Sequence, residues 1–288
     1  MTTVIRKVTV LGAGVLGAQI AFQSAYSGFD VTVYDVDDDA LGKAQKRFGE
    51  LAAIYAAEVP GAADGKAEAT AAAVRLTSDL ADAVREADLV VEAVPEILDL
   101  KREIYTKIGE CAPEKTIFAT NSSTLLPSDM KDSTGRPDRF LALHFANQVW
   151  KFNTAEVMGT DETDPAVFDR VVDFAEAIGM VPIPIHKEKA GYVLNSLLVP
   201  LLRAAGELAA GGYATPEDVD KVWQIATGAP LGPFRIYDVI GLATPYNILS
   251  HGDQQAQHIA AWLKENYIDA GKLGLATGEG FYRYADGK

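Results

Sequence analysis

Three glycines near the amino terminus constrain this chain more than any other feature. Gly12, Gly14 and Gly17 have the spacing G-x-G-x-x-G and follow an apolar stretch, residues 7–11, that is typical of a buried strand. The residues after them predict a helix, and the next predicted strand ends in an acid, Asp35. This order of strand, glycine turn, helix, strand and acid is typical of a dinucleotide-binding fold.

Each position of the glycine turn has a physical role in such a fold. Gly12 permits the tight turn, Gly14 lets the backbone approach a pyrophosphate, and Gly17 lets the helix pack closely on the strand. Val15 and Leu16 complete the predicted cofactor-binding segment, because they open the helix whose first N–H groups would meet the phosphate charge.

The acid that follows the second strand indicates which dinucleotide is bound. Asp35 would accept hydrogen bonds from the hydroxyls of the adenosine ribose. Three further acids at 37–39 would repel a 2′-phosphate, so the sequence predicts NAD rather than NADP. The alternative is a glycine turn in a related fold that holds no cofactor.

The order of predicted elements divides the chain into two domains. Strands alternate with helices over residues 1–186, which predicts an α/β domain of Rossmann type with a doubly wound, mainly parallel sheet. Residues 187–288 predict an all-helical domain. Its helices are expected around 192–210, 217–227, 232–249 and 254–268.

Composition excludes several classes of function. Forty acidic residues against 26 Lys and Arg give a net charge of −14, which argues against a nucleic-acid or anionic-membrane surface. No apolar run has the length of a membrane helix. The single cysteine, Cys111, excludes an intramolecular disulfide and a cysteine-only metal site, and it fits a cytoplasmic protein. No metal site is expected.

His144 and Glu156 are the first catalytic candidates. Residues 140–144 and 154–158 predict two strands, and a hairpin centred near Trp150 would place His144 opposite Glu156, with Cβ atoms about 5 Å apart. A carboxylate at that distance can fix the imidazole tautomer and raise its basicity. Such a base could take a hydroxyl proton as hydride leaves the same carbon. The alternative is a histidine with a purely structural role.

Other polar residues are expected near the same site. Ser123, in the segment 121–124, follows a predicted parallel strand, and ligands bind beyond the carboxyl ends of such strands. Glu96 and Lys101 follow the preceding strand and would flank the cofactor. Asn195 is a polar residue in an otherwise apolar helix. Helix capping, a solvated helix start and a buried amide bonded to backbone are the respective structural alternatives.

Ordered motifs along nearly the whole chain carry a family resemblance. Besides the glycine turn they are residues 91–96 (VEAVPE), 121–123 (NSS), 139–147 (RFLALHFAN), 156–157 (EV), 191–198 (GYVLNSLL), 228–234 (GAPLGPF) and 277–282 (TGEGFY). In these motifs the chain resembles the L-3-hydroxyacyl-CoA dehydrogenases.

The resemblance implies a role for each matched residue. His144 would be the catalytic base oriented by Glu156, and Ser123 and Asn195 would contact the 3-oxygen of the substrate. NAD would be contacted by Asp35, Glu96, Lys101, Ser123 and Asn147. The implied reaction interconverts an (S)-3-hydroxyacyl thioester and its 3-ketoacyl form, and the implied partner is an acyl-CoA. The helical domain would bind substrate and form a homodimer.

One departure from the family pattern follows the catalytic histidine. The family usually has Asn-Pro where this chain has Asn147 and Gln148, and residues 149–153 rebuild the loop before Glu156. Because proline constrains a turn, the loop and the pocket wall are expected to differ.

Two further departures concern basic residues. Leu275 and Ala276 stand where the family often has lysines. Residues 51–58 lack the basic side chains near which CoA phosphates dock in the family, although Lys43, Lys46 and Arg47 lie one to two turns earlier. These changes leave open two alternatives to a short-chain 3-hydroxyacyl-CoA dehydrogenase. One is the same chemistry on a free 3-hydroxy acid, of the carnitine or sugar-acid type, and the other is a non-enzymatic NAD-binding protein.

Overall fold

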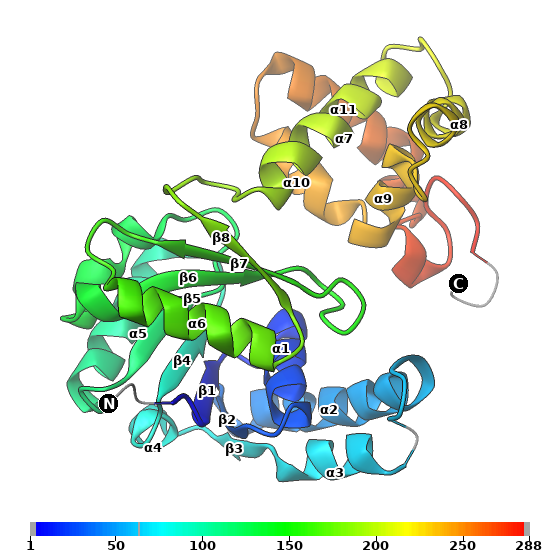
Figure 1. The fold of residues 1–288 in the computed structure, drawn as a ribbon. Coiled ribbons are helices and arrows are strands. Elements are labelled where there is room, and N and C mark those ends of the chain that lie inside the picture. The colour runs from blue at the N-terminus through cyan, green and yellow to red at the C-terminus, as the bar shows by residue number, and fades with distance from the viewer. Residues whose placement is uncertain (1–3, 63, 285–288) are drawn as a thin grey trace. The chain divides into compact units, whose positions relative to one another are not determined.

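One eight-stranded sheet forms the framework of the first part of the chain (Figure 1). The computed structural model describes residues 4–62 and 64–284. The strands are β1 (Lys7–Leu11), β2 (Asp30–Tyr34), β3 (Arg75–Thr77), β4 (Leu89–Glu92), β5 (Ile117–Thr120), β6 (Phe140–Phe145), β7 (Thr154–Gly159) and β8 (Val181–Ile185). Their order is β3-β2-β1-β4-β5-β6-β7-β8. Only the β6–β7 pairing is antiparallel, so the expected doubly wound, mainly parallel sheet is confirmed.

Helices cover both faces of this sheet. They are α1 (Val15–Tyr26), α2 (Asp38–Glu58), α3 (Lys66–Ala73), α4 (Leu80–Val84), α5 (Leu98–Cys111) and α6 (Pro165–Ala177). The largest apolar core joins α1, α2, α3 and α6 to side chains such as Val10 and Val91 on one face. A smaller core joins α4 and α5 to Leu11, Val90 and Phe118 on the other face. Alternate residues of β1 and β4 therefore supply the two cores, as the period of a strand requires.

The same alternation gathers polar side chains at one place on the sheet. Glu92, Thr120, His144 and Glu156 lie at or near the ends of β4 to β7 and are buried. Their neighbours in sequence, Val91, Ala119, Leu143 and Val157, belong to the larger core on the opposite face. The polar residues consequently share the other face, where α5 packs.

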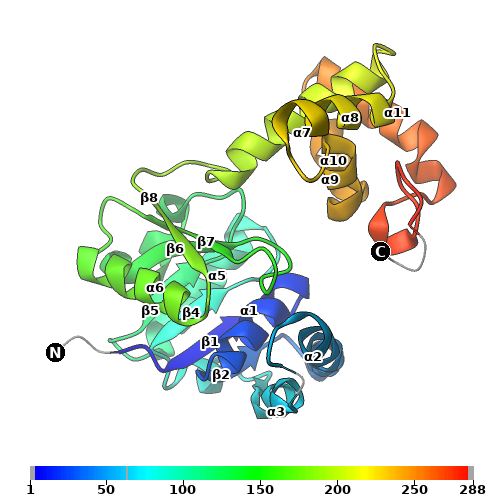
Figure 2. The ribbon, with the colours of Figure 1, turned by 45° about the vertical axis from the view of Figure 1, so that its right-hand side comes forward.

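The second part of the chain is a compact helical unit, Leu194–Lys288, and the first unit is Met1–Val193. The sequence-based boundary, after residue 186, lies earlier along the chain. The helices are α7 (Leu194–Ala210), α8 (Pro216–Thr227), α9 (Pro233–Ile240), α10 (Ala243–Ser250) and α11 (Gln254–Asn266) (Figure 2). Their core contains Leu202, Phe234, Tyr237, Ile259, Leu263 and Phe281.

One helix prediction in this unit is wrong. A continuous helix was expected over 232–249, but the structure has α9 and α10, with Gly241 between them. Gly241 has a φ of +88°, a conformation that glycine adopts without steric cost and that ends a helix. Among the described residues, no helix combines the length and the apolar character needed to cross a membrane.

Candidate active site

The glycine turn between β1 and α1 has the geometry that its spacing predicts. Gly12 has a φ of +92°, and a Cβ there would lie 2.7 Å from the carbonyl oxygen of Ala93. A Cβ at Gly17 would collide with the carbonyl oxygen of Gly12. A Cβ at Gly14 would meet nothing within 4 Å, so open space lies in front of that residue. Two glycines therefore allow close packing, and the third leaves room for a ligand.

This open space fits a dinucleotide. Gly14 is the N-cap of α1, and among the described residues no side chain caps the first N–H groups of this helix. Such groups attract a phosphate. Asp35 lies beside the turn, where its Oδ2 accepts a hydrogen bond from Ala13 N–H at 2.8 Å. Arg47 of α2 donates to the carbonyl oxygen of Ala13 at 3.0 Å, a contact that the sequence did not predict.

His144 and Glu156 lie directly opposite each other in the β6–β7 ladder, as the hairpin predicted. His144 Nδ1 is 2.8 Å from Glu156 Oε2, and both side chains are buried. Because an ionised carboxylate only accepts hydrogen bonds, Nδ1 is the donor and Nε2 is left as an acceptor. Ser123 Oγ donates to Nε2 at 3.1 Å. The acceptor nitrogen therefore faces the hydroxyl that the sequence placed near the site.

Glu96 holds the turn that carries Ser123. Its Oε1 accepts hydrogen bonds from Ser122 Oγ at 2.5 Å, from Ser123 N–H at 3.1 Å, and from both Thr124 N–H and Thr124 Oγ1. Burial alone would raise the pKa of Glu96. The hydrogen bonds from Ser122 and Thr124, together with the charge of Lys101, outweigh that effect and lower the pKa to about 2. Glu96 is consequently a carboxylate at neutral pH.

Glu96 also contacts a buried ion pair, which Lys101 forms with Glu92. Lys101 Nζ lies 2.5 Å from Glu92 Oε1 and 3.3 Å from Glu96 Oε2. Glu92 Oε2 accepts further hydrogen bonds from Thr120 Oγ1 at 2.8 Å and from Tyr105 O–H at 3.2 Å. Lys101 is thus enclosed by the two carboxylates, and its charge stabilises the ionised form of Glu96.

The loop after His144 differs from the turn that a proline would form. Gln148 has a φ of +60°, and its N–H donates to Oε1 of Gln19 on α1 at 2.7 Å. Trp150 Nε1–H donates to Glu58 Oε2 of α2 at 2.9 Å, and its ring packs on Tyr55. The loop is therefore fixed to α1 and α2 by these contacts.

Replacing Gln148 with Pro should lower the free energy of unfolding by more than about 1 kcal/mol, because proline cannot reach a positive φ and has no N–H for Gln19. Gln148→Gly keeps both features and should stay within about 1 kcal/mol of the parent. Urea unfolding of the two variants measures the difference. Equal stability of Gln148→Pro and the parent would contradict this conformation of the loop.

Asn147 and Asn195 are the remaining polar residues that the sequence predicts for the site. Asn147 is exposed in the loop after β6. Asn195 belongs to the helical unit, where it lies in the first turn of α7 and lines an apolar groove with Leu198 and Ile248. Asn147 is thus placed by the first unit, after β6, and Asn195 by the helical unit, in α7.

Two supporting residues were missed at the sequence level, although each leaves a signal there. Glu92 is an acid within the apolar run 89–94, and Gln19 is a polar residue within an apolar helix. Buried polar groups of this kind require hydrogen-bond partners, and both make long-range ones, Glu92 with Thr120 and Gln19 with Gln148.

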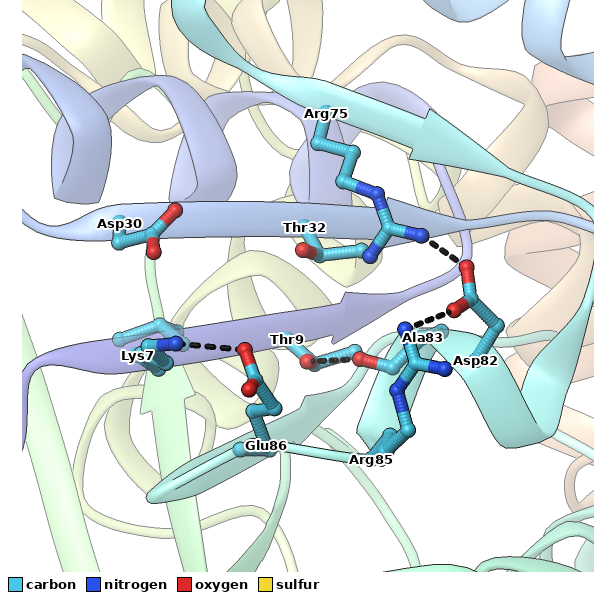
Figure 3. Close-up of a pocket in the computed structure, with 11 residues that line it drawn as sticks. Lys7, Thr9, Asp30, Thr32, Arg75, Asp82, Ala83, Arg85 and Glu86 are labelled. Atoms are coloured by element: carbon cyan, nitrogen blue, oxygen red, sulfur yellow. Dashed lines mark hydrogen bonds and ion pairs between the residues drawn. The ribbon is translucent and has the colours of Figure 1, made fainter.

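A second pocket lies at the opposite edge of the sheet, near the amino ends of β1 to β3 (Figure 3). Five of its six charged side chains form ion pairs: Asp82 binds Arg75 and Arg85, and Lys7 binds Glu86. Asp30 is the sixth, and it brings the lining to three positive and three negative side chains. Because these charges are compensated within the pocket, we assign no ligand to it.

Comparison with known proteins decides the family. Residues 7–189 match the model of the 3-hydroxyacyl-CoA dehydrogenase NAD-binding domain, and residues 191–284 match the C-terminal domain of the same family. The chain belongs to the 3-hydroxyacyl-CoA dehydrogenase family. It is an NAD-dependent oxidoreductase.

Similar proteins and solved structures match this chain over nearly its whole length. The mitochondrial hydroxyacyl-coenzyme A dehydrogenase of Rattus norvegicus is 37% identical over 97% of this chain and 91% of its own. The structure of a diketoreductase, described as acting on dicarbonyl compounds, is 67% identical with a TM-score of 0.96, covering 98% of this chain and 100% of that one. The (S)-3-hydroxybutyryl-CoA dehydrogenase of Ralstonia eutropha is 29% identical with a TM-score of 0.82, with the same coverage.

Proposed function

We propose that this member of the 3-hydroxyacyl-CoA dehydrogenase family interconverts a short-chain (S)-3-hydroxyacyl-CoA and its 3-ketoacyl form. The hydrogen-bonded set Ser123–His144–Glu156 carries the proposal, because it presents an acceptor nitrogen beside a hydroxyl at the carboxyl end of the sheet. NAD, when bound, supplies the acceptor for the hydride that leaves C3.

His144 is the general base in this proposal. In the oxidative direction Nε2 takes the proton of the substrate hydroxyl as the C3–H bond breaks, and in reduction it returns that proton to the oxygen. Glu156 holds Nδ1–H and stabilises the imidazolium that forms. Ser123 and Asn195 are proposed to hydrogen-bond the 3-oxygen.

Cofactor contacts complete the proposal. The glycine turn would hold the pyrophosphate and Asp35 the ribose, while Glu96, Ser123 and Asn147 would line the site. Lys101 would contribute to cofactor binding indirectly, because its ammonium group lies beside Glu96 and keeps that carboxylate ionised. The single cysteine and the acidic surface are consistent with a protein of the cytoplasm, which we propose as its compartment.

A free dicarbonyl compound is the second candidate substrate. The 67% identity to a diketoreductase favours it. The candidate phosphate-binding residues of α2 also favour it, since Lys43 pairs with Asp39, Lys46 pairs with Glu50, and Arg47 reaches the glycine turn. A 3-ketoacyl thioester is itself a dicarbonyl compound, so the same base serves both substrates.

Nicotinamide absorbance with NADH and each substrate tests the choice. Acetoacetyl-CoA is compared with free acetoacetate and with 2,4-pentanedione. Faster oxidation with the thioester supports the first candidate, and faster oxidation with the free compounds supports the second. Oxidation with none of the three, despite measurable NADH binding, would contradict both.

We also propose a homodimer formed through the helical unit. Val222 and Ile225 of α8 are 67% and 76% exposed, which is unusual for large apolar side chains on one helix face. Light scattering after size exclusion should give the dimer mass, and Ile225→Glu should shift it toward the monomer. Val181→Glu, at the exposed edge strand β8, is the control that should remain dimeric. A monomer mass for the parent at all concentrations would overturn the proposal.

A further inference from the structure

Tyr192 lies against the imidazole of His144. The two rings are stacked, with centroids 4.5 Å apart and planes inclined by 16°. Tyr192 is buried, and Ala142 and Met158 complete a small apolar cluster around it. One face of the imidazole is therefore covered by an aromatic ring, while its two nitrogens bind Glu156 and Ser123.

The backbone of Tyr192 has an unusual conformation. Its φ is +52°, in the left-handed region that residues with a Cβ rarely adopt. Tyr192 N–H donates to the carbonyl oxygen of Lys189 at 3.0 Å, which closes a turn. The following amide, Val193 N–H, then donates to Oε1 of Glu156 at 2.8 Å. Strained residues of this kind persist where the surrounding structure requires them.

Tyr192 thus restrains both His144 and Glu156. Its ring contacts His144, and the turn that it forms brings Val193 N–H to Oε1 of Glu156, while His144 binds Oε2. Both hydrogen bonds of the imidazole lie in its plane, so they restrain rotation within the plane more than tilting out of it. When a substrate hydroxyl replaces Ser123 at Nε2, the stacked ring is what opposes this tilt.

We propose that Tyr192 is a positioning residue of the reaction, which fixes the plane of His144 through its ring and the carboxylate of Glu156 through its left-handed turn. The proposal rests on the proposed role of His144 as the base. Because an error of about 1 Å in the position of a reacting group can cost about 100-fold in rate, loss of the ring should act mainly on kcat.

Three variants separate the ring from the backbone. Tyr192→Phe keeps the ring and should retain kcat within about twofold. Tyr192→Leu removes the ring and keeps an apolar side chain, and Tyr192→Gly removes the ring but adopts the left-handed turn without strain. Both should lower kcat about 10- to 100-fold, with KM and the Kd of NADH changed less than about threefold.

Phe48→Leu is the matched control for stability. It removes a buried ring from α2, in the core on the opposite face of the sheet, and should lower the Tm without changing kcat. If Tyr192→Leu and Tyr192→Gly both had the kcat of the parent while His144→Gln was inactive, the positioning role of Tyr192 would be overturned and the proposed function would stand. A parent-like kcat in His144→Gln would instead overturn the proposed function.

A spectroscopic measurement tests the stacking without activity. The chain has four histidines, so NMR of protein labelled at histidine gives few ring signals, and His144→Gln assigns the one that matters. The ring protons of His144 should be shifted upfield by the Tyr192 ring current in the parent and in Tyr192→Phe. They should return downfield in Tyr192→Leu and Tyr192→Gly. Unchanged shifts in these two variants would overturn the proposal.

Discussion

Replacing His144 with Gln should lower kcat by about 10²- to 10⁴-fold, the contribution typical of a positioned general base. Glutamine retains polar atoms, but it has no nitrogen that can accept a proton at neutral pH. The Kd of NADH should stay within about twofold, since the glycine turn and Asp35 lie at other strand ends. Steady-state turnover and fluorescence titration of NADH measure the two quantities.

His258→Gln is the matched control for this change. His258 is an exposed residue of α11 and lies in the helical unit, so the variant should turn over at the rate of the parent. If His144→Gln were as active as His258→Gln, another group would have to be the base. A large loss of NADH affinity in His144→Gln would also contradict the account, because it would make the effect one of cofactor binding.

Replacing Lys101 with Met should lower the free energy of unfolding by about 3–5 kcal/mol, the cost of leaving a buried charge without its partner. Glu92 is 0% exposed, and Lys101, at 1%, lies 2.5 Å from it. The change also removes a positive charge from beside Glu96. Urea unfolding of the variant, followed by circular dichroism, gives the expected loss.

An exposed ion pair on the same helix provides the control. Lys107 and Glu103 of α5 are 2.7 Å apart, and more than half of each side chain is exposed. Lys107→Met should change stability by at most about 0.5 kcal/mol. If Lys101→Met and Lys107→Met lost the same free energy of unfolding, the removal of Lys101 would not leave an unpaired buried charge on Glu92, and the account of this ion pair would be wrong. Combining Glu92→Gln with Lys101→Met should recover part of the loss.

Much of this architecture could be predicted from local patterns in the sequence. The glycine spacing requires a turn in which Gly12 and Gly17 have no room for a Cβ, and the structure has that turn. The register of His144 with Glu156 follows from two short strands and a hairpin whose length fixes the pairing. Both predictions depend only on residues close in sequence or on the two-residue period of a strand.

The buried residues around His144 and Ser123 could not be predicted in the same way. Glu92, Lys101 and Glu96 form one cluster only because α5 packs over the carboxyl ends of β4 and β5. Tyr192 reaches His144 through a left-handed backbone that tyrosine seldom adopts, so no propensity indicates it. The division at Gly241 was missed because the apolar spacing of 232–249 continues across it.

Transfer of deuterium tests the central claim most directly. NADH carrying deuterium at the transferred position of C4 is incubated with the 3-oxo substrate that proves fastest, and the product is examined by NMR. We predict one deuterium at C3 of an (S)-3-hydroxy product with the parent enzyme, and product formation at least 100-fold slower with His144→Gln. An unlabelled product, a label on another carbon, or the same rate with His144→Gln would contradict hydride transfer to C3 with His144 as the acid and base.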